Sequence, residues 1–170
     1  MNIEVDNKVD QNQHLRNILA SVTDPEIPVL SIDEMGILRD VQLEDDTVVV
    51  TITPTYSGCP AMDQIRQDVS TTLGKHGYKN STVKLVLSPA WTTDWMGDEA
   101  KRKLRDYGIA PPCKTSATGS LDEQEMSFSA ACPLCRSLNT QKVSEFGSTA
   151  CKALWKCLDC LEPFDYFKPI

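Results

Sequence analysis

The stretch that decides the fold runs from Thr47 to Met62 and reads TVVVTITPTYSGCPAM. Its first six residues alternate in the way that is typical of a half-buried strand. A loop that ends in Gly58, Cys59 and Pro60 then leads into a segment with helical periodicity. The apolar residues of that segment are Met62, Ile65, Val69 and Leu73. A strand that passes through a short loop into an amphipathic helix predicts a domain that combines helices with a sheet.

The flanking segments extend this pattern. Val41 and Leu43 alternate ahead of an acidic turn at 44–46, which predicts a β-hairpin with the strand described above. Residues 83–87 alternate as a third strand, and because a helix precedes it, we expect it to pair in parallel through a right-handed crossover. Helices are also expected over 14–22 and 98–107. The predicted fold class is α+β, with a small three-stranded mixed sheet.

The chain then changes in character. Residues 111–130 contain few large apolar side chains and are typical of a linker, whereas 131–170 are rich in paired cysteines and aromatic residues. We therefore predict an α+β domain over 1–110, a linker over 111–130 and a small C-terminal module over 131–170.

Composition excludes several classes of function. The chain has 170 residues and a net charge of -7, which argues against nucleic-acid binding through neutralised phosphates. No apolar run approaches the roughly 20 residues that cross a bilayer. Residues 1–13 are polar and acidic, without the basic and apolar regions of a secretory signal. We expect a cytoplasmic protein that binds neither nucleic acid nor membranes.

The cysteines point to metal chemistry. Five of the seven cysteines lie in the last 39 residues, and four of them form the C-x-x-C pairs Cys132/Cys135 and Cys157/Cys160, separated by 21 residues. Two such pairs can close a tetrahedral site around one ion, and a module of this size buries too little apolar surface to fold without one. Structural zinc is the leading interpretation; iron, an iron–sulfur cluster or a thiol redox pair stay open.

Cys59 is the second chemical feature. Pro60 favours the first turn of a helix, so Cys59 is expected at the N-cap, where unpaired N–H groups favour a thiolate. The helix dipole alone contributes less than about one pKa unit, so a metal or cation would have to complete the activation. The alternative is a half-buried cap residue without chemistry.

Other candidate ligands are weaker. Asp24 and Glu26, with Asp33 and Glu34, could add hard oxygen ligands beside Cys59, although Asp24 before Pro25 also suits an Asx turn. Cys151 lies between the two cysteine pairs and is either a small buried residue or a further metal ligand close to the zinc. We expect ordinary structural roles for the remaining residues. His14 and His76 should lie at the surface, and Trp91, Trp95 and Met96 in the core or lining a groove.

Five runs of sequence carry a resemblance to a known family. They are 24–28 (DPEIP), 53–60 (TPTYSGCP), 89–96 (PAWTTDWM), 145–154 (EFGSTACKAL) and 162–168 (EPFDYFK). The first three resemble the SufT-like iron–sulfur maturation family. Together, over nearly the whole chain, all five resemble the D subunits of bacterial phenylacetyl-CoA epoxidase systems.

The resemblance implies an accessory role in aerobic phenylacetate breakdown rather than an enzyme. Its expected partners are the di-iron oxygenase and its iron–sulfur flavin reductase, and a homodimer stays open. By analogy Cys59 matches the family's reactive cysteine, with Cys113 or Cys151 as further ligands for transient iron or a cluster. Cys132, Cys135, Cys157 and Cys160 match the ligands of a zinc ribbon.

Two positions depart from the family's pattern. Glu34 stands where relatives usually carry aspartate, and Pro169 where some have a last cysteine. The alternative function is a non-catalytic structural or adaptor subunit of the oxygenase, held together by structural zinc.

Overall fold

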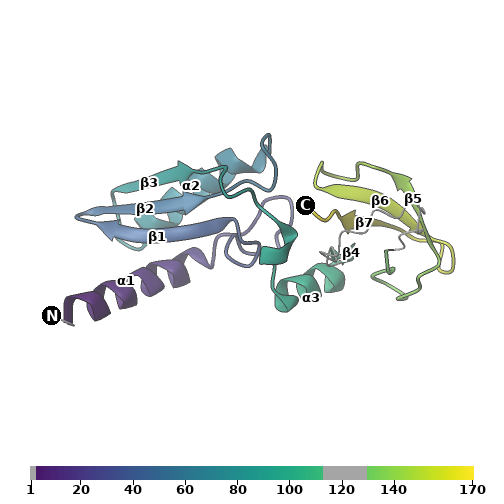
Figure 1. Cartoon of the computed structure of the whole chain (residues 1–170), viewed down its shortest axis with the longest axis horizontal. Coiled ribbons are helices and arrows are strands. Elements are labelled where there is room, and N and C mark those ends of the chain that lie inside the picture. The colour runs from purple at the N-terminus through teal and green to yellow at the C-terminus, as the bar shows by residue number, and fades with distance from the viewer. Residues whose placement is uncertain (1–2, 113–129) are drawn as a thin grey trace. The chain divides into compact units, whose positions relative to one another are not determined.

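The computed structural model describes residues 3–112 and 130–170, with the backbone alone for 3–9. It divides into an N-terminal unit, Met1–Gly97, and a C-terminal unit, Asp98–Ile170. Figure 1 shows the helices and strands of both units. The elements of the N-terminal unit are α1 (Ile3–Leu19), β1 (Leu38–Glu44), β2 (Thr47–Ile52), α2 (Ala61–Lys75), β3 (Ser81–Leu85) and the 3-10 turn η1 (Thr93–Trp95). Those of the C-terminal unit are α3 (Asp98–Asp106), β4 (Ile109–Ala110), β5 (Thr140–Ser144), β6 (Lys152–Cys157) and β7 (Pro163–Phe167).

The sheet of the N-terminal unit has the predicted topology. Its order is β1-β2-β3, with β1 antiparallel to β2 and β2 parallel to β3. The alternation along β2 buries Val48, Val50 and Ile52 on one face, where α1 packs against β1 and α2 against β3. The three-stranded mixed sheet is thereby confirmed, because one buried face and one intervening helix fix both register and direction.

The first helix differs from its prediction. α1 begins at Ile3 and ends at Leu19, whereas the apolar periodicity predicted 14–22. Val22 is buried from a loop, where its carbonyl accepts a hydrogen bond from the Ile32 N–H and Thr23 pairs with Ser31. Apolar periodicity alone cannot distinguish a buried helical residue from a residue such as Val22, which is buried but lies in a loop.

Gly36 shows how tightly the loop after α1 packs against the segment around Trp95. It has φ +71°, and a Cβ built on it would lie 2.8 Å from the Cβ of Trp95. The Arg39 guanidinium stacks 3.6 Å from the Trp95 ring, and the Trp91 Nε1 donates to the Met35 carbonyl. Trp91 and Met96 are buried, as predicted for core residues, while Trp95 is half-buried.

We expect Gly36→Ala to destabilise the N-terminal unit by about 2–5 kcal/mol, since it adds left-handed strain to a steric collision. The matched control is Gly74→Ala in α2, where a Cβ meets nothing within 4 Å. That change should be neutral or stabilising by about 0.4–1 kcal/mol. Denaturant unfolding of both variants measures the difference; equal midpoints would contradict the packing described for Gly36.

The C-terminal unit is built on a four-stranded sheet of order β4-β7-β6-β5. It includes α3 and β4, because Ile109 and Ala110 pair in parallel with Asp165 and Tyr166 of β7. The two compact units divide at Gly97/Asp98, and the domain bounds 1–110, 111–130 and 131–170 stay predictions. A two-residue strand leaves no periodic signal, so its partner was not visible in the sequence. Most of the expected linker, 113–129, lies outside the described residues.

Asp165 organises the turn between β5 and β6. Its carboxylate accepts a hydrogen bond from the Ser148 hydroxyl at 2.7 Å and lies 3.8 Å from the Nζ of the buried Lys152. A Cβ at Gly147 would collide with the same carboxylate. The run 145–154 thus folds around a charge pair contributed by β6 and β7.

Candidate metal centre and thiol site

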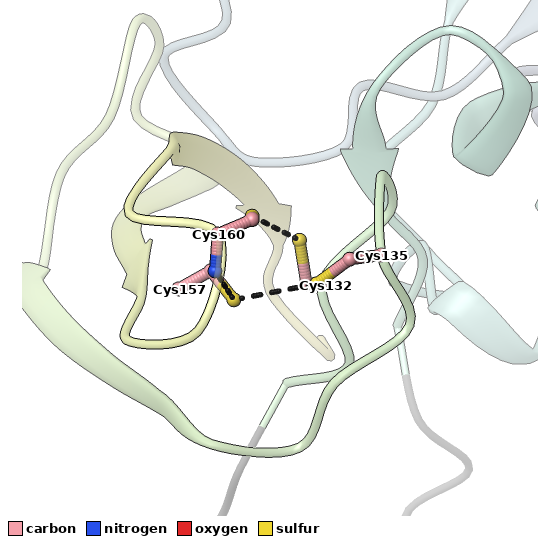
Figure 2. Close-up of side chains that lie close together, drawn as sticks. All are labelled: Cys132, Cys135, Cys157 and Cys160. Atoms are coloured by element: carbon pink, nitrogen blue, oxygen red, sulfur yellow. Dashed lines mark hydrogen bonds between the residues drawn. The ribbon is translucent and has the colours of Figure 1, made fainter.

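The two C-x-x-C pairs meet in the C-terminal unit (Figure 2). The sulfurs of Cys132 and Cys160 lie 3.8 Å apart and those of Cys135 and Cys157 lie 3.5 Å apart. All four sulfurs lie within 4.8 Å of one another. Among the side chains described, those of residues 10–112 and 130–170, this is the one group of three or more His, Cys, Asp or Glu residues placed to hold a metal ion.

The backbone turns place the sulfurs of both C-x-x-C pairs close to one another. Cys157 ends β6 and Cys160 lies in the turn before β7, while Cys132 and Cys135 precede β5. Each turn is closed by a residue in the left-handed region directly after its second cysteine: Arg136 (φ 64°) and Leu161 (φ 66°).

Asp159 joins the two turns. Its carboxylate accepts hydrogen bonds from the Asn139 side-chain amide and the Ser137 hydroxyl. These two donors lower the pKa of Asp159, so its negative charge is stabilised at neutral pH. The pair of turns is thereby held in place by contacts other than the four sulfurs.

The thiols do not ionise alike without a cation. The backbone N–H of Cys160, aided by that of Asp159, lowers the pKa of the Cys157 thiol to about 7. The pKa of Cys160 is raised to about 12, since burial and the neighbouring Cys157 and Cys135 outweigh the N–H of Glu162. Four thiolates this close repel one another, so a bound cation is what allows all four to be deprotonated together.

The donor set fits a single tetrahedral ion. With metal–sulfur bonds of about 2.3 Å, a tetrahedral site requires sulfur–sulfur distances of roughly 3.8 Å. Two of the separations, 3.5 Å for Cys135/Cys157 and 3.8 Å for Cys132/Cys160, are close to that value. Four soft ligands with no open position are typical of a structural site rather than a catalytic one.

Cys59 lies just ahead of α2 in the N-terminal unit. It is half-buried, and its N–H donates to the Tyr56 carbonyl. Pro60, not Cys59, is the N-cap residue, and α2 begins at Ala61, so the expected cap position is shifted by one residue. The Ala61 N–H still points at the thiol and lowers its pKa.

The rest of its surroundings disfavours the thiolate. Burial is the largest influence on Cys59 and raises its pKa above the ordinary value of a cysteine thiol, and the carboxylates of Glu26 and Asp24 raise it further. The Ala61 N–H and the Thr55 side chain act in the opposite direction but do not compensate. Burial and the two acids thus oppose the effect of the helix start, so a metal or cation is still needed to favour the thiolate, as the sequence indicated.

We expect Cys59 to react slowly with iodoacetamide at pH 7.5 and faster as the pH rises, since only the thiolate attacks. Glu26→Gln removes a negative charge that disfavours the thiolate, so it should lower the pKa of Cys59 and increase the rate by about 2–5-fold. Mass spectrometry of the Cys59 peptide gives the rate. Glu44→Gln, on the exposed end of β1, should leave it unchanged. A slower rate in Glu26→Gln would contradict the proposed electrostatics.

The acidic residues around this loop have structural partners. One Asp24 carboxylate oxygen accepts hydrogen bonds from the N–H groups of Glu26 and Ile27, so the expected Asx turn is present. Glu34 accepts from Ser31, and Asp33 pairs with Arg16 at 2.7 Å. The structure does not gather Asp24, Glu26 and Cys59 into one preformed ligand set; the two acids act on the thiol through their charge.

The remaining candidates that the structure describes are not members of the four-cysteine cluster. Cys151 is buried just before β6, its sulfur 3.0 Å from the Thr149 hydroxyl, whereas Cys157 ends the same strand. Six residues of extended chain place Cys151 roughly 20 Å from Cys157. Cys151 is therefore a small buried residue and not a further ligand close to the four cysteines. Cys113 lies outside the described residues. His14 and His76 are exposed, as predicted.

Sequence reasoning missed Thr55 and the pair Lys152/Asp165. Thr55 is buried beside Cys59 and hydrogen-bonds to its sulfur. Its position four residues before a candidate thiol was the only available signal. No signal in the sequence indicated that Lys152 is buried, because a lysine in a strand is usually solvated.

Two family models match this chain. Residues 12–85 match the iron–sulfur cluster assembly protein family, and residues 113–168 match the PaaD zinc beta ribbon domain. A solved structure from Bacillus anthracis, a domain of unknown function called DUF59, covers 59% of this chain and 96% of its own at 29% identity and a TM-score of 0.55. Fold and site thus define an iron–sulfur-assembly-type domain followed by a zinc-ribbon-type module whose four cysteines could hold a metal ion.

The relatives narrow the class further. An Escherichia coli K12 protein, provisionally named as the D subunit of 1,2-phenylacetyl-CoA epoxidase, is 46% identical over 90% of each chain. An Fe-S protein maturation auxiliary factor of Porphyromonas gingivalis is 37% identical over 51% of this chain and 84% of its own. The chain belongs to the PaaD family of epoxidase D subunits.

No helix in the described part of the chain is long and apolar enough to span a bilayer.

Proposed function

We propose that this protein is an accessory factor that assembles or inserts the iron or iron–sulfur centres of a phenylacetyl-CoA epoxidase system, with Cys59 as the transfer thiol. The observation that carries the proposal is Cys59 itself: a reachable thiol flanked by two carboxylates, within the domain that matches an iron–sulfur assembly family. The Fe-S maturation factors among the relatives support the same role.

The environment of Cys59 suits brief rather than permanent binding. The negative charge of Glu26 and Asp24 that raises the pKa of the thiol also attracts a cation to it. When iron binds, the S–H proton is released to solvent and the thiolate of Cys59 becomes a single soft ligand to the iron. Because the described residues offer no complete ligand set here, the cargo is held weakly and can pass to a client protein.

The four-cysteine centre has a different role in this proposal. We infer that Cys132, Cys135, Cys157 and Cys160 hold one structural zinc, which stabilises the ribbon and leaves no position open for cargo. The ribbon then serves as the surface that recognises the oxygenase or its iron–sulfur flavin reductase. The N-terminal unit would then transfer the metal, and the C-terminal unit would recognise the client protein.

Anaerobic iron and sulfide analysis tests the transfer role in purified protein. After incubation with ferrous iron and sulfide, wild-type protein should retain iron beyond one zinc per chain, and Cys59→Ser should retain only the zinc. Cys151→Ser is the matched control, since Cys151 is a buried cysteine outside the four-cysteine group, and this variant should bind iron like wild type. Equal iron in wild type and Cys59→Ser would overturn the assignment of Cys59.

One observation favours a second candidate, an adaptor subunit without metal transfer. The surroundings of Cys59 raise the pKa of its thiol, and Asp24 is engaged by its own turn. An adaptor would co-purify stably with the oxygenase whether or not Cys59 is replaced.

A further inference from the structure

A cavity of about 660 Å³ lies within the C-terminal unit, beside the metal centre. α3 forms one wall and the first cysteine turn forms another, and Cys132 is part of its lining. Its volume falls in the range of roughly 300–1,000 Å³ that is typical of small-molecule sites. The lining residues are Asp98, Lys101, Arg102, Arg105, Ala110, Pro111, Pro112, Ala131, Cys132 and Arg136.

Positive charge converges on this cavity in a protein whose net charge is -7. Lys101 and Arg105 are four residues apart on α3 and so lie on one face, and Arg136 comes from the first cysteine turn. Among the described residues, no ion pair or hydrogen bond is formed by these three side chains. Arg102 is neutralised by Glu99 and Asp106, and among the described lining residues Asp98 is the one acid.

Arg136 carries a second, independent observation. It has φ 64° in the turn after Cys135, a conformation that glycine adopts without cost and other residues only with strain. An arginine at this position places a guanidinium beside the cavity, although its backbone conformation strains the turn. Leu161 holds the equivalent position in the second turn, φ 66°, but does not line the cavity.

We infer that this cavity binds a small phosphorylated molecule with an apolar portion, of the nucleotide or coenzyme A type. Arginine forks and a lysine recognise phosphate oxygens, and Arg105 and Arg136 approach from two sides. Ala110, Pro111 and Ala131 offer apolar contacts to the rest of the ligand. A concave site of this size suits a small molecule better than an extended acidic chain. The inference is independent of the metal-transfer role of Cys59.

Isothermal titration of the full-length, zinc-loaded protein with ADP and with coenzyme A tests this site. At least one of them should saturate one site per chain, more tightly at 50 than at 200 mM salt, and inorganic phosphate should bind more weakly. Arg136→Gly should weaken binding by about tenfold or more, because it removes a charged donor. The same variant relieves the turn, so its unfolding midpoint should not fall.

Leu161→Gly is the matched control, since it relieves the same strain in the other turn and should leave affinity within about twofold of wild type. A second pair separates charge from turn geometry: Arg105→Gln should weaken binding, and Lys103→Gln, on the same helix but outside the lining, should not. The inference is overturned if neither compound saturates, or if the control variants weaken binding as much as the cavity variants.

Discussion

Removing the metal from the four-cysteine centre is expected to unfold the ribbon while the N-terminal unit stays folded. Apparent binding energies of structural zinc are about 10–16 kcal/mol, more than a small module gains from its own core. The buried cluster of the C-terminal unit is small, and two of its members are the ligands Cys132 and Cys157. Losing the ion would therefore remove the main contribution to the stability of this unit.

Hydrogen exchange resolved by peptide measures this directly, with a strong zinc chelator or with Cys157→Ala. Amides of β5, β6 and β7 should lose protection, while those of β1, β2 and α2 keep it. Cys151→Ala is the matched control, a buried cysteine of the same unit that should cost only about 1 kcal/mol. Ribbon amides that remain protected without metal would show that the aromatic core is sufficient, and the structural role of the ion would be wrong.

Replacing Cys59 with serine is expected to abolish maturation of the epoxidase system without unfolding this protein. Serine has nearly the same shape as cysteine, and Cys59 is half-buried before a helix, so the fold and the zinc content should be unchanged. Its hydroxyl is a hard donor that stays protonated, so it cannot replace the soft sulfur. Epoxidase activity in cells that depend on this copy should fall by roughly 100-fold or more, since a first ligand matters at least as much as its supporting residues.

Thr55→Val provides a graded comparison. It keeps the thiol but removes the hydroxyl that lowers the pKa of Cys59, so activity should fall less than in Cys59→Ser. Full activity in Cys59→Ser, with the variant protein confirmed to be present, would favour the adaptor role instead.

The sequence predicted those features that depend on neighbours along the chain. Alternation in 41–52 predicts the hairpin, a helix between two strands predicts their parallel pairing, and C-x-x-C spacing predicts the four-cysteine cluster. In each case a short-range pattern carries the physical cause, and the structure shows the expected arrangement.

Other features depend on residues far apart in the chain. The raised pKa of Cys59 comes from burial and from Glu26 and Asp24, more than 30 residues away in sequence, so no local pattern could reveal it. The pairing of β4 with β7 joins residues more than 50 positions apart. The basic cavity likewise combines α3 with a cysteine turn that follows it by some 30 residues. Such properties are set by tertiary packing.

The iron content of the purified oxygenase and reductase tests the delivery of metal by Cys59 most directly. Both would be isolated anaerobically from otherwise identical cells that express wild-type protein or Cys59→Ser, and iron would be counted per polypeptide. We predict normal zinc in both forms of the accessory protein, but an iron-deficient oxygenase or reductase only with Cys59→Ser. Fully metallated oxygenase and reductase from the variant cells would contradict the transfer role and leave a zinc-stabilised adaptor.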